Sequence, residues 1–383
     1  MSSNIPPASE TSQGAPGRSS RPAAVTTDEL LPPIEPPSAR FFIQLFVTPA
    51  IIVAGVVLVW FVIESLARRG AQDPEEIVRA LRSNNQARFQ KAKDLADMLR
   101  TPQRYPELRT NRKLAQELSK LLDELVTAGD DADSAVSMRI FLGMALGEFH
   151  VDEGLPVLLR MARDDPERDV RRRAINAIAV LAGGLAGLKP PQHVASDELI
   201  ETLEQLTDDQ DDLIRSETAY ALGVVAAGPQ ADPRLTAALE ELAEDLYIDA
   251  RFNAALGLSR VGSSRAAAAL AEIFDAEALQ SSAFGEQQMT EEVTVEQLRQ
   301  LRTYKRDLIL GNAMREVSRL LENKKLTPDD RTALDEAVSA LLKEAPGIEK
   351  PAPLQREAVA ELKRLQSKLQ SQAPSQVTRP DPT

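Results

Sequence analysis

Three stretches of the sequence decide the fold. They are DVRRRAINAIAVLAG from Asp169, DLIRSETAYALGVVA from Asp212 and DARFNAALGLSRVG from Asp249. Each begins with an aspartate that an arginine follows two or three residues later. These arginines are Arg171, Arg215 and Arg251. Four and seven residues after each arginine stand apolar residues, and this spacing places them on one face of a helix.

The same frame extends beyond the three stretches. It recurs at Arg139, more loosely at Arg88, and weakly at Arg306, where Leu310 and Ala313 take the apolar positions. An acidic pair precedes three of the arginines by six and seven residues, and each pair follows an apolar helical segment. The repeated unit is therefore a helix, a short acidic turn and a second helix. Because small residues are frequent on the second helix, we expect neighbouring helices to approach closely.

The repeats resemble the HEAT-repeat family, in particular the short bacterial HEAT-like repeats of the phycobilisome-lyase type. The resemblance implies an all-α fold, an α-solenoid of helix pairs that bury their apolar stripes only against neighbouring pairs. It also implies a ladder of aspartates and arginines between units, here Asp169, Arg171, Asp212, Arg215, Asp249, Arg251 and Arg139. The alternative function for Arg171, Arg215 and Arg251 is to bind an anionic ligand.

A second decisive feature is the run Phe41–Ile63, which contains no charged residue. A helix of this length spans roughly 34 Å, enough for a hydrocarbon core of about 30 Å. Arg40 on one side and Arg68 and Arg69 on the other flank it. We therefore predict a single transmembrane helix over residues 41–64, in preference to a cleaved signal peptide or a buried core helix.

The chain is predicted to divide into six parts. These are a disordered Pro/Ser-rich tail (1–40), the transmembrane helix (41–64), a HEAT-like solenoid (71–275), a polar loop (276–293), C-terminal helices capping the solenoid (294–371) and a disordered tail (372–383). The C-terminal helices are expected over 294–322, 328–344 and 352–371. The last of these caps the solenoid or, alternatively, pairs with a partner helix. More Arg residues follow the membrane run than precede it, which favours a cytoplasmic location for residues 71–383 over a periplasmic or external one.

Composition excludes several chemistries. The 383 residues include no Cys and two His, so thiol catalysis, Cys-ligated zinc, Fe–S clusters and His-rich metal centres are excluded. The net charge of −13 and 4% aromatic residues disfavour nucleic-acid binding. The acidic turn at Asp208–Asp212 lacks the Gly and Glu of an EF-hand loop, because Leu213 and Ala219 occupy those positions.

No catalytic motif is present, and His150 and His193 lack the His-Glu pairs of di-iron HEAT-like hydroxylases. We therefore expect no enzyme activity, cofactor, metal or small-molecule substrate. The predicted function is that of a bacterial, single-pass membrane scaffold that binds a protein partner through the solenoid surface and the bilayer through Phe41–Ile63. The alternatives are an accessory or chromophore-lyase-like factor that acts on a client protein, and an envelope-facing structural protein.

Overall fold

The computed structural model describes residues 40, 43–70, 74–83, 87–101, 105, 107–194, 196–228, 231–281, 294–344 and 356–371. All regular secondary structure in these residues is helical. The chain forms two compact units, Met1–Ala67 and Arg68–Thr383. The tails predicted over 1–40 and 372–383 lie outside the described residues, apart from Arg40.

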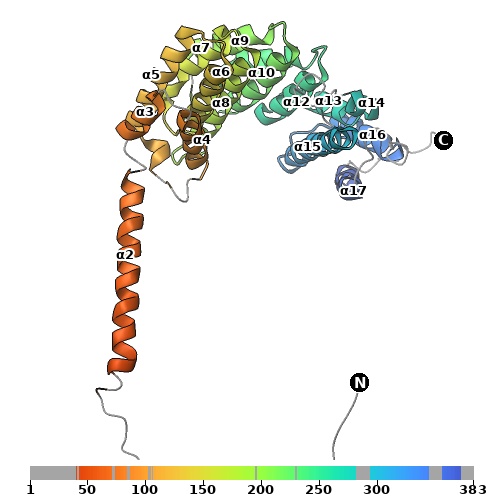
Figure 1. Cartoon of the computed structure of the whole chain (residues 1–383). Coiled ribbons are helices and arrows are strands. Elements are labelled where there is room, and N and C mark those ends of the chain that lie inside the picture. Colours follow the sequence, from red (N-terminus) through yellow and green to blue (C-terminus); the bar gives the residue numbers. More distant parts are fainter. Residues whose placement is uncertain are drawn as a thin grey trace, which may run out of the picture. The chain divides into compact units, whose positions relative to one another are not determined.

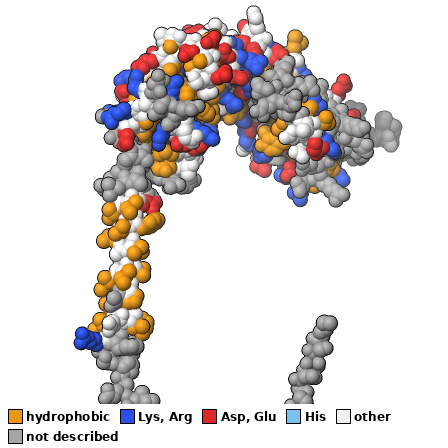
Figure 2. Space-filling view, viewed as in Figure 1, with side chains coloured by type: hydrophobic (Ala, Val, Ile, Leu, Met, Phe, Trp, Pro, Cys, Tyr) orange, Lys and Arg blue, Asp and Glu red, His pale blue; other side chains and the backbone are white. Residues whose placement is uncertain are grey.

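The first unit contains the apolar run. A π-helical turn, Ile43–Val47, leads into α2 (Thr48–Gly70). Ile43–Glu64 is long and apolar enough to cross a membrane, by length and composition. Its large apolar side chains are exposed, with Trp60 at 62% and Phe61 at 66%. Figure 2 shows hydrophobic side chains along the face of this helix that is in view. Helix α2 continues beyond the predicted boundary at residue 64, so Arg68 and Arg69 belong to its last turn.

The second unit is a stack of helix pairs (Figure 1). The first helices of the pairs pack on one another, and the second helices form another layer. The pairs are α3 (Pro74–Arg82) with α4 (Ala87–Leu99), α5 (Arg112–Ala128) with α6 (Asp133–Gly147), α7 (Leu155–Asp164) with α8 (Arg168–Ala186), α9 (Asp197–Thr207) with α10 (Asp212–Val225), and α11 (Pro233–Leu242) with α12 (Ile248–Val261). Short 3-10 turns, Leu108–Thr110 and Asp152–Gly154, precede α5 and α7.

The apolar frame counted from each arginine forms the core between the layers. Ile175 and Ile178 on α8, and Ala219 and Leu222 on α10, are at most 1% exposed. The equivalent residues after Arg139, Arg251, Arg88 and Arg306 are buried as well. In each helix where the sequence shows this spacing, the apolar residues counted from the arginine therefore lie on the buried face.

The C-terminal helices continue the alternation of layers. They are α13 (Ala266–Ile273), α14 (Ala276–Ser281), α15 (Val295–Glu322), α16 (Pro328–Glu344) and α17 (Arg356–Ser371). Helix α15 packs on α12 and α13, α16 packs on α13, and α17 packs on α15 and α16. Part of the segment expected to be a polar loop is thus the helix α14, whereas residues 282–293 lie outside the described residues.

Glycine sets the spacing between α10 and α12. A Cβ atom built on Gly223 meets the Cα of Gly257 at 2.7 Å, a distance that real Cβ atoms essentially never show. The neighbouring atom is backbone, so no flexible side chain can move aside. The two helices therefore touch through their backbones, and any larger residue at this point separates them.

We predict that Gly223→Ala lowers the midpoint of thermal unfolding of the full chain. Overpacking of this kind costs about 1–3 kcal/mol. The matched control is Gly183→Ala on α8, whose new Cβ meets only Val224 Cγ1 at 3.5 Å. In that variant the better helix propensity of alanine is expected to add up to about 1 kcal/mol. Circular dichroism of the detergent-solubilised chain measures both, and equal midpoints for the two variants would contradict the close approach.

Candidate functional site

The most deeply buried charge in the described chain is Arg139 on α6, with no exposed surface. Its Nε lies 2.8 Å from Oδ2 of Asp165, whose side chain is 1% exposed. Its Nη1 donates to the carbonyl oxygen of Asp130 at 2.6 Å. Asp165 follows α7, and its Oδ1 also accepts the backbone N–H of Glu167 at 3.0 Å. One carboxylate thus shapes the turn of its own pair and binds the arginine of the preceding pair.

The next joint repeats this arrangement. Arg171 on α8 places Nη2 3.3 Å from each carboxylate oxygen of Asp209. Asp209 in turn accepts the backbone N–H of Asp211 at 2.8 Å, just before α10. The arginine and its carboxylate are again contributed by successive helix pairs.

The third joint has the most hydrogen bonds. Arg215 on α10 donates from Nε to Oδ2 of Asp245 at 2.7 Å and from Nη2 to Oδ1 at 3.1 Å. Its Nη1 also donates to the carbonyl oxygen of Asp209 at 2.8 Å. Asp245 accepts the backbone N–H of Tyr247 at 2.6 Å. A bidentate pair of this kind fixes both distance and orientation between repeats.

The last joint of the series uses glutamate. Arg251 on α12 donates from Nε to Glu272 on α13 at 2.7 Å, and from Nη1 to the carbonyl oxygen of Asp245 at 2.7 Å. We call these four pairs the arginine ladder. The ladder runs from α6 to α13 through Arg139–Asp165, Arg171–Asp209, Arg215–Asp245 and Arg251–Glu272.

The ladder carboxylates are not the aspartates at which the three decisive stretches begin. Asp212 bonds to Arg215 within α10 at 2.7 Å, and Asp169 pairs with Arg172 within α8 at 3.4 Å. Asp249 instead accepts Nζ of Lys305 on α15 at 2.5 Å. The expected ladder named Asp169, Asp212 and Asp249, whereas the aspartates that bind an arginine of the preceding pair are Asp165, Asp209 and Asp245. They belong to the acidic pairs of the turns, six residues before the next arginine.

Charge at the third joint is strongly stabilised. The hydrogen bond to Asp245 raises the pKa of Arg215 above its ordinary value. Burial acts to raise the pKa of Asp245, but hydrogen bonds from Arg215 and from the Tyr247 N–H, together with the nearby positive charge, bring it below its ordinary value. Both groups are therefore charged at neutral pH. Since the ladder arginines are already paired with carboxylates, these contacts do not favour the alternative of anionic-ligand binding.

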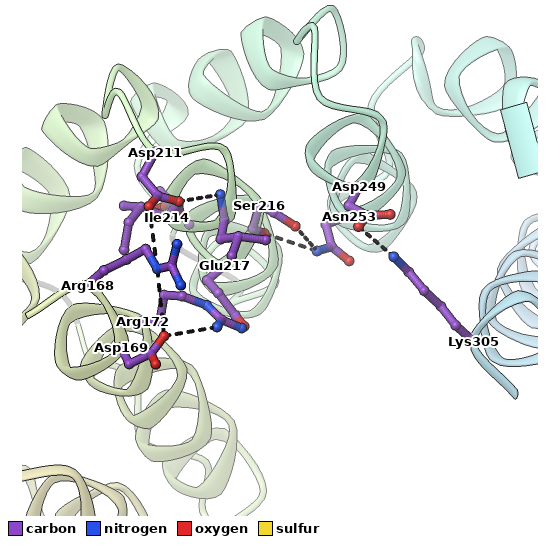
Figure 3. A network of polar contacts seen from close by, with 12 residues as sticks. Arg168, Asp169, Arg172, Asp211, Ile214, Ser216, Glu217, Asp249, Asn253 and Lys305 are labelled. Carbon is purple, nitrogen blue, oxygen red and sulfur yellow. Dashed lines mark hydrogen bonds and ion pairs between the residues drawn. The ribbon is translucent and has the colours of Figure 1, made fainter. Parts of the chain in front are cut away.

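A second row of polar contacts crosses the second helices (Figure 3). Arg172 on α8 pairs with Glu217 on α10 at 3.3 Å. The amide of Asn253 on α12 donates to the carbonyl oxygen of Ser216 at 3.0 Å and to its hydroxyl at 3.2 Å. The pair Asp249–Lys305 then joins α12 to α15. These links connect four successive second helices, α8, α10, α12 and α15, independently of the ladder.

Sequence reasoning missed this second row. Most of its members on α8, α10 and α12 stand one or two residues after a ladder arginine, whereas Asp249 stands two residues before Arg251, and the chemistry differs from pair to pair. Lys305 is the clearest omission. Burial lowers its pKa from the ordinary lysine value, and the charge and hydrogen bond of Asp249 offset part of that effect. The indication in the sequence is that Lys305 stands directly before Arg306, the arginine at which the repeat frame recurs weakly.

The two histidines lie in separate places. His150 donates its backbone N–H to the carbonyl oxygen of Arg109 at 2.7 Å. Burial, and then the charge of Arg109, lower the pKa of its ring. His193 packs beside Gly228. Among the described residues, no group of three or more His, Asp or Glu side chains is placed to hold a metal ion.

We predict that Arg139→Leu strongly destabilises the repeat region, because it leaves Asp165 buried without its cation. Removing one partner of a buried pair costs about 3–5 kcal/mol. The added change Asp165→Asn keeps an oxygen for the Glu167 N–H and removes the buried charge, so the double variant is expected to regain part of the loss. Urea unfolding of the solubilised chain measures each variant. The control is Arg265→Leu, which breaks an exposed pair with Glu244 and is expected to change stability by less than about 1 kcal/mol.

The Asp245 carboxylate also predicts an acid dependence. Because its pKa is lower in the folded chain, its stabilising contribution is complete above the ordinary value of 3.8 and is lost as the pH falls through the folded value. Asp245→Asn is therefore expected to lower the unfolding midpoint at pH 7, with the difference from the unchanged protein shrinking below about pH 4. The exposed Asp208→Asn serves as the control. A difference that stays constant from pH 7 to pH 3 would rule out this origin.

Comparison with known proteins agrees with the repeat geometry. Residues 118–223 match the model that describes HEAT repeats. The match begins within α5 and ends within α10, so it includes the joints made by Arg139 and Arg171. No curated protein matches the chain. Over this span the chain is similar to HEAT-repeat proteins, and HEAT repeats commonly mediate protein–protein interaction.

Proposed function

We propose that this protein is a single-pass membrane scaffold, anchored by residues 41–64, that holds a protein partner on its helical repeats. The observation that supports it best is the pairing of two features in one chain. One is a helix whose apolar side chains are exposed on all sides; the other is a long array of helix pairs fixed in register by charged joints. The proposal includes a cytoplasmic location for residues 71–383, supported by Arg68 and Arg69 at the end of α2.

The anchor is supported by the exposure of the apolar helix. Side chains from Ile51 to Ile63 include many that are more than half exposed, among them Ile52 at 61% and Leu58 at 63%. Burying such side chains in an apolar medium stabilises by about 25 cal/mol for each Å² of apolar surface. A bilayer provides that medium around the whole circumference of a helix, whereas a protein core contacts one side of an amphipathic helix.

The scaffold role is supported by what the charged residues do. The ladder and the second row use arginines, carboxylates and amides to hold helices together, so these groups act in structure. The exposed side of the second helices is then a fixed surface of mixed character. Met144 on α6, Asn176 and Val180 on α8, and Tyr220 and Val224 on α10 are half-buried there. Repeat arrays bind proteins through such extended surfaces by complementarity of shape and charge.

Deleting residues 43–64 is expected to move the protein from the membrane pellet to the supernatant after carbonate extraction, because the apolar helix is removed. Deleting residues 2–39 is the control and is expected to leave the protein in the pellet.

On intact cells, external protease is expected to spare residues 71–383, and their digestion would overturn the cytoplasmic assignment. A protein is further expected to co-purify with the full chain but not with residues 1–70 alone. Retention of the variant that lacks residues 43–64 in the membrane pellet contradicts the anchor. Recovery of equal amounts of co-purified protein with the full chain and with residues 1–70 alone contradicts the scaffold.

A further inference from the structure

The N-terminal half of α15 exposes apolar side chains. Outside residues 43–63, the large hydrophobic residues that are exposed in the described chain are Leu246, Val295, Leu301, Tyr304 and Leu308. Leu301, Tyr304 and Leu308 are 48%, 69% and 48% exposed and follow one another at spacings of three and four residues. Such spacing aligns them along one side of the helix. The exposure is thus an apolar stripe, not a scatter of single residues.

The same side of α15 continues into a groove. The next positions at this spacing are Gly311 and Arg315, and both line a groove of about 570 Å³ between α15 and α17. Leu365 on α17 lies in the groove, and a Cβ built on Gly311 meets nothing closer than Arg315 Nη1 at 3.6 Å. The glycine therefore leaves room for a chain to lie close to α15.

The groove is lined with cations. Arg315 and Arg319 come from α15, and Arg364 and Lys368 from α17, while Glu322 and Glu361 are the acidic residues of the lining. Arg319 is held by Glu316 at 2.8 Å and by the hydroxyl of Ser259 at 3.0 Å. Arg364 and Lys368 are exposed, and among the described residues neither makes an ion pair at 4 Å or less. The groove therefore offers positive charge in a chain whose net charge is −13.

We propose that this surface, which we call the α15–α17 face, binds an amphipathic helix of a partner protein. The partner helix carries apolar residues that contact Leu301, Tyr304 and Leu308, and carboxylates that contact Arg364 and Lys368. The inference rests on the proposed scaffold function and names the class of partner. A helix that binds in a groove places its own apolar residues, spaced at i, i+3 or i+4 and i+7, against the receptor. The stripe on α15 has matching spacing, and the opposite charges select the direction of the bound helix.

Two other occupants fit the face less well. Pairing with the same face of a second copy places two sets of the cations Arg315, Arg364 and Lys368 in one interface, and like charges brought near one another cost free energy. An anionic bilayer is flat, whereas Gly311 and Leu365 lie in a groove between two helices. A rod-shaped segment with negative charge reaches both the stripe and the groove.

Site-specific photo-crosslinking in the native membranes tests the proposal. Tyr304 is replaced by benzoylphenylalanine in the full chain, and Tyr220 is replaced in a second chain for comparison. The expected product at Tyr304 is a crosslink to an acidic amphipathic segment of another protein, mapped by mass spectrometry. Products formed only with residues 282–293 of the same chain, with a second copy or with lipid overturn the proposal, as does the absence of a product.

A charge-reversal series tests the groove directly. A synthetic peptide copied from the crosslinked segment is titrated onto the solubilised full chain by fluorescence anisotropy. The double change Arg364→Glu and Lys368→Glu is expected to weaken binding by at least about tenfold, as is Leu308→Glu. The matched control, Arg173→Glu with Lys189→Glu, reverses two exposed charges elsewhere and is expected to change binding by less than about twofold. Circular dichroism verifies that each variant is folded, and equal weakening by both double changes overturns the assignment to this groove.

The two proposals fail in different ways. A crosslinked partner at Tyr220 without one at Tyr304 leaves the scaffold function standing and overturns the α15–α17 face. If neither position gives a crosslink, and residues 1–70 alone recover as much protein as the full chain, both the scaffold function and the α15–α17 face are overturned.

Discussion

The repeat region depends on one interaction, the guanidinium–carboxylate pair at each joint. Arg139 and Asp165 show it in its most buried form, with essentially no exposed surface on either side chain. Bringing two charges out of water is costly, so such a pair contributes little net stability compared with an apolar contact, whereas breaking it is expensive. Its main effect is therefore on register. A slip of one helix past another leaves a buried charge without a partner.

This constraint explains why the turn residues are acidic. Asp165, Asp209 and Asp245 each accept a backbone N–H two residues later and an arginine from the preceding pair. The turn geometry thereby presents a carboxylate to the joint in a fixed direction. With the arginine satisfied, the small residues of the second helices are free to touch, and α10 and α12 approach through Gly223 and Gly257. Charge fixes the register, and glycine permits the contact.

The sequence predicted the helical core well because its signal is local. Positions four and seven residues after the arginine stay within one helix, where spacing alone determines the face. The ladder expected from the sequence named Asp169, Asp212 and Asp249 in place of Asp165, Asp209 and Asp245, because the contact between an arginine and the next pair is not local. Arg171 reaches an aspartate 38 residues away, and Arg215 one 30 residues away, so variable loop lengths hide the relation. For the same reason, the sequence could not show that α15 follows α12 in the second layer.

Helix α15 also shows why apolar spacing alone does not define a binding surface. Leu301 and Leu308 follow the same kind of helical spacing as Leu310 and Ala313, yet the first two are half exposed and the last two are buried. Only the packing of α12, α13 and α17 around α15 separates core from surface. The same holds for charge. Each ladder pair is neutral in sum, so the net charge of −13 lies on the remaining residues, and this total does not describe the local charge of the groove. A local cationic groove on an otherwise acidic protein favours acidic partners at one place and repels them elsewhere, and selectivity requires both effects.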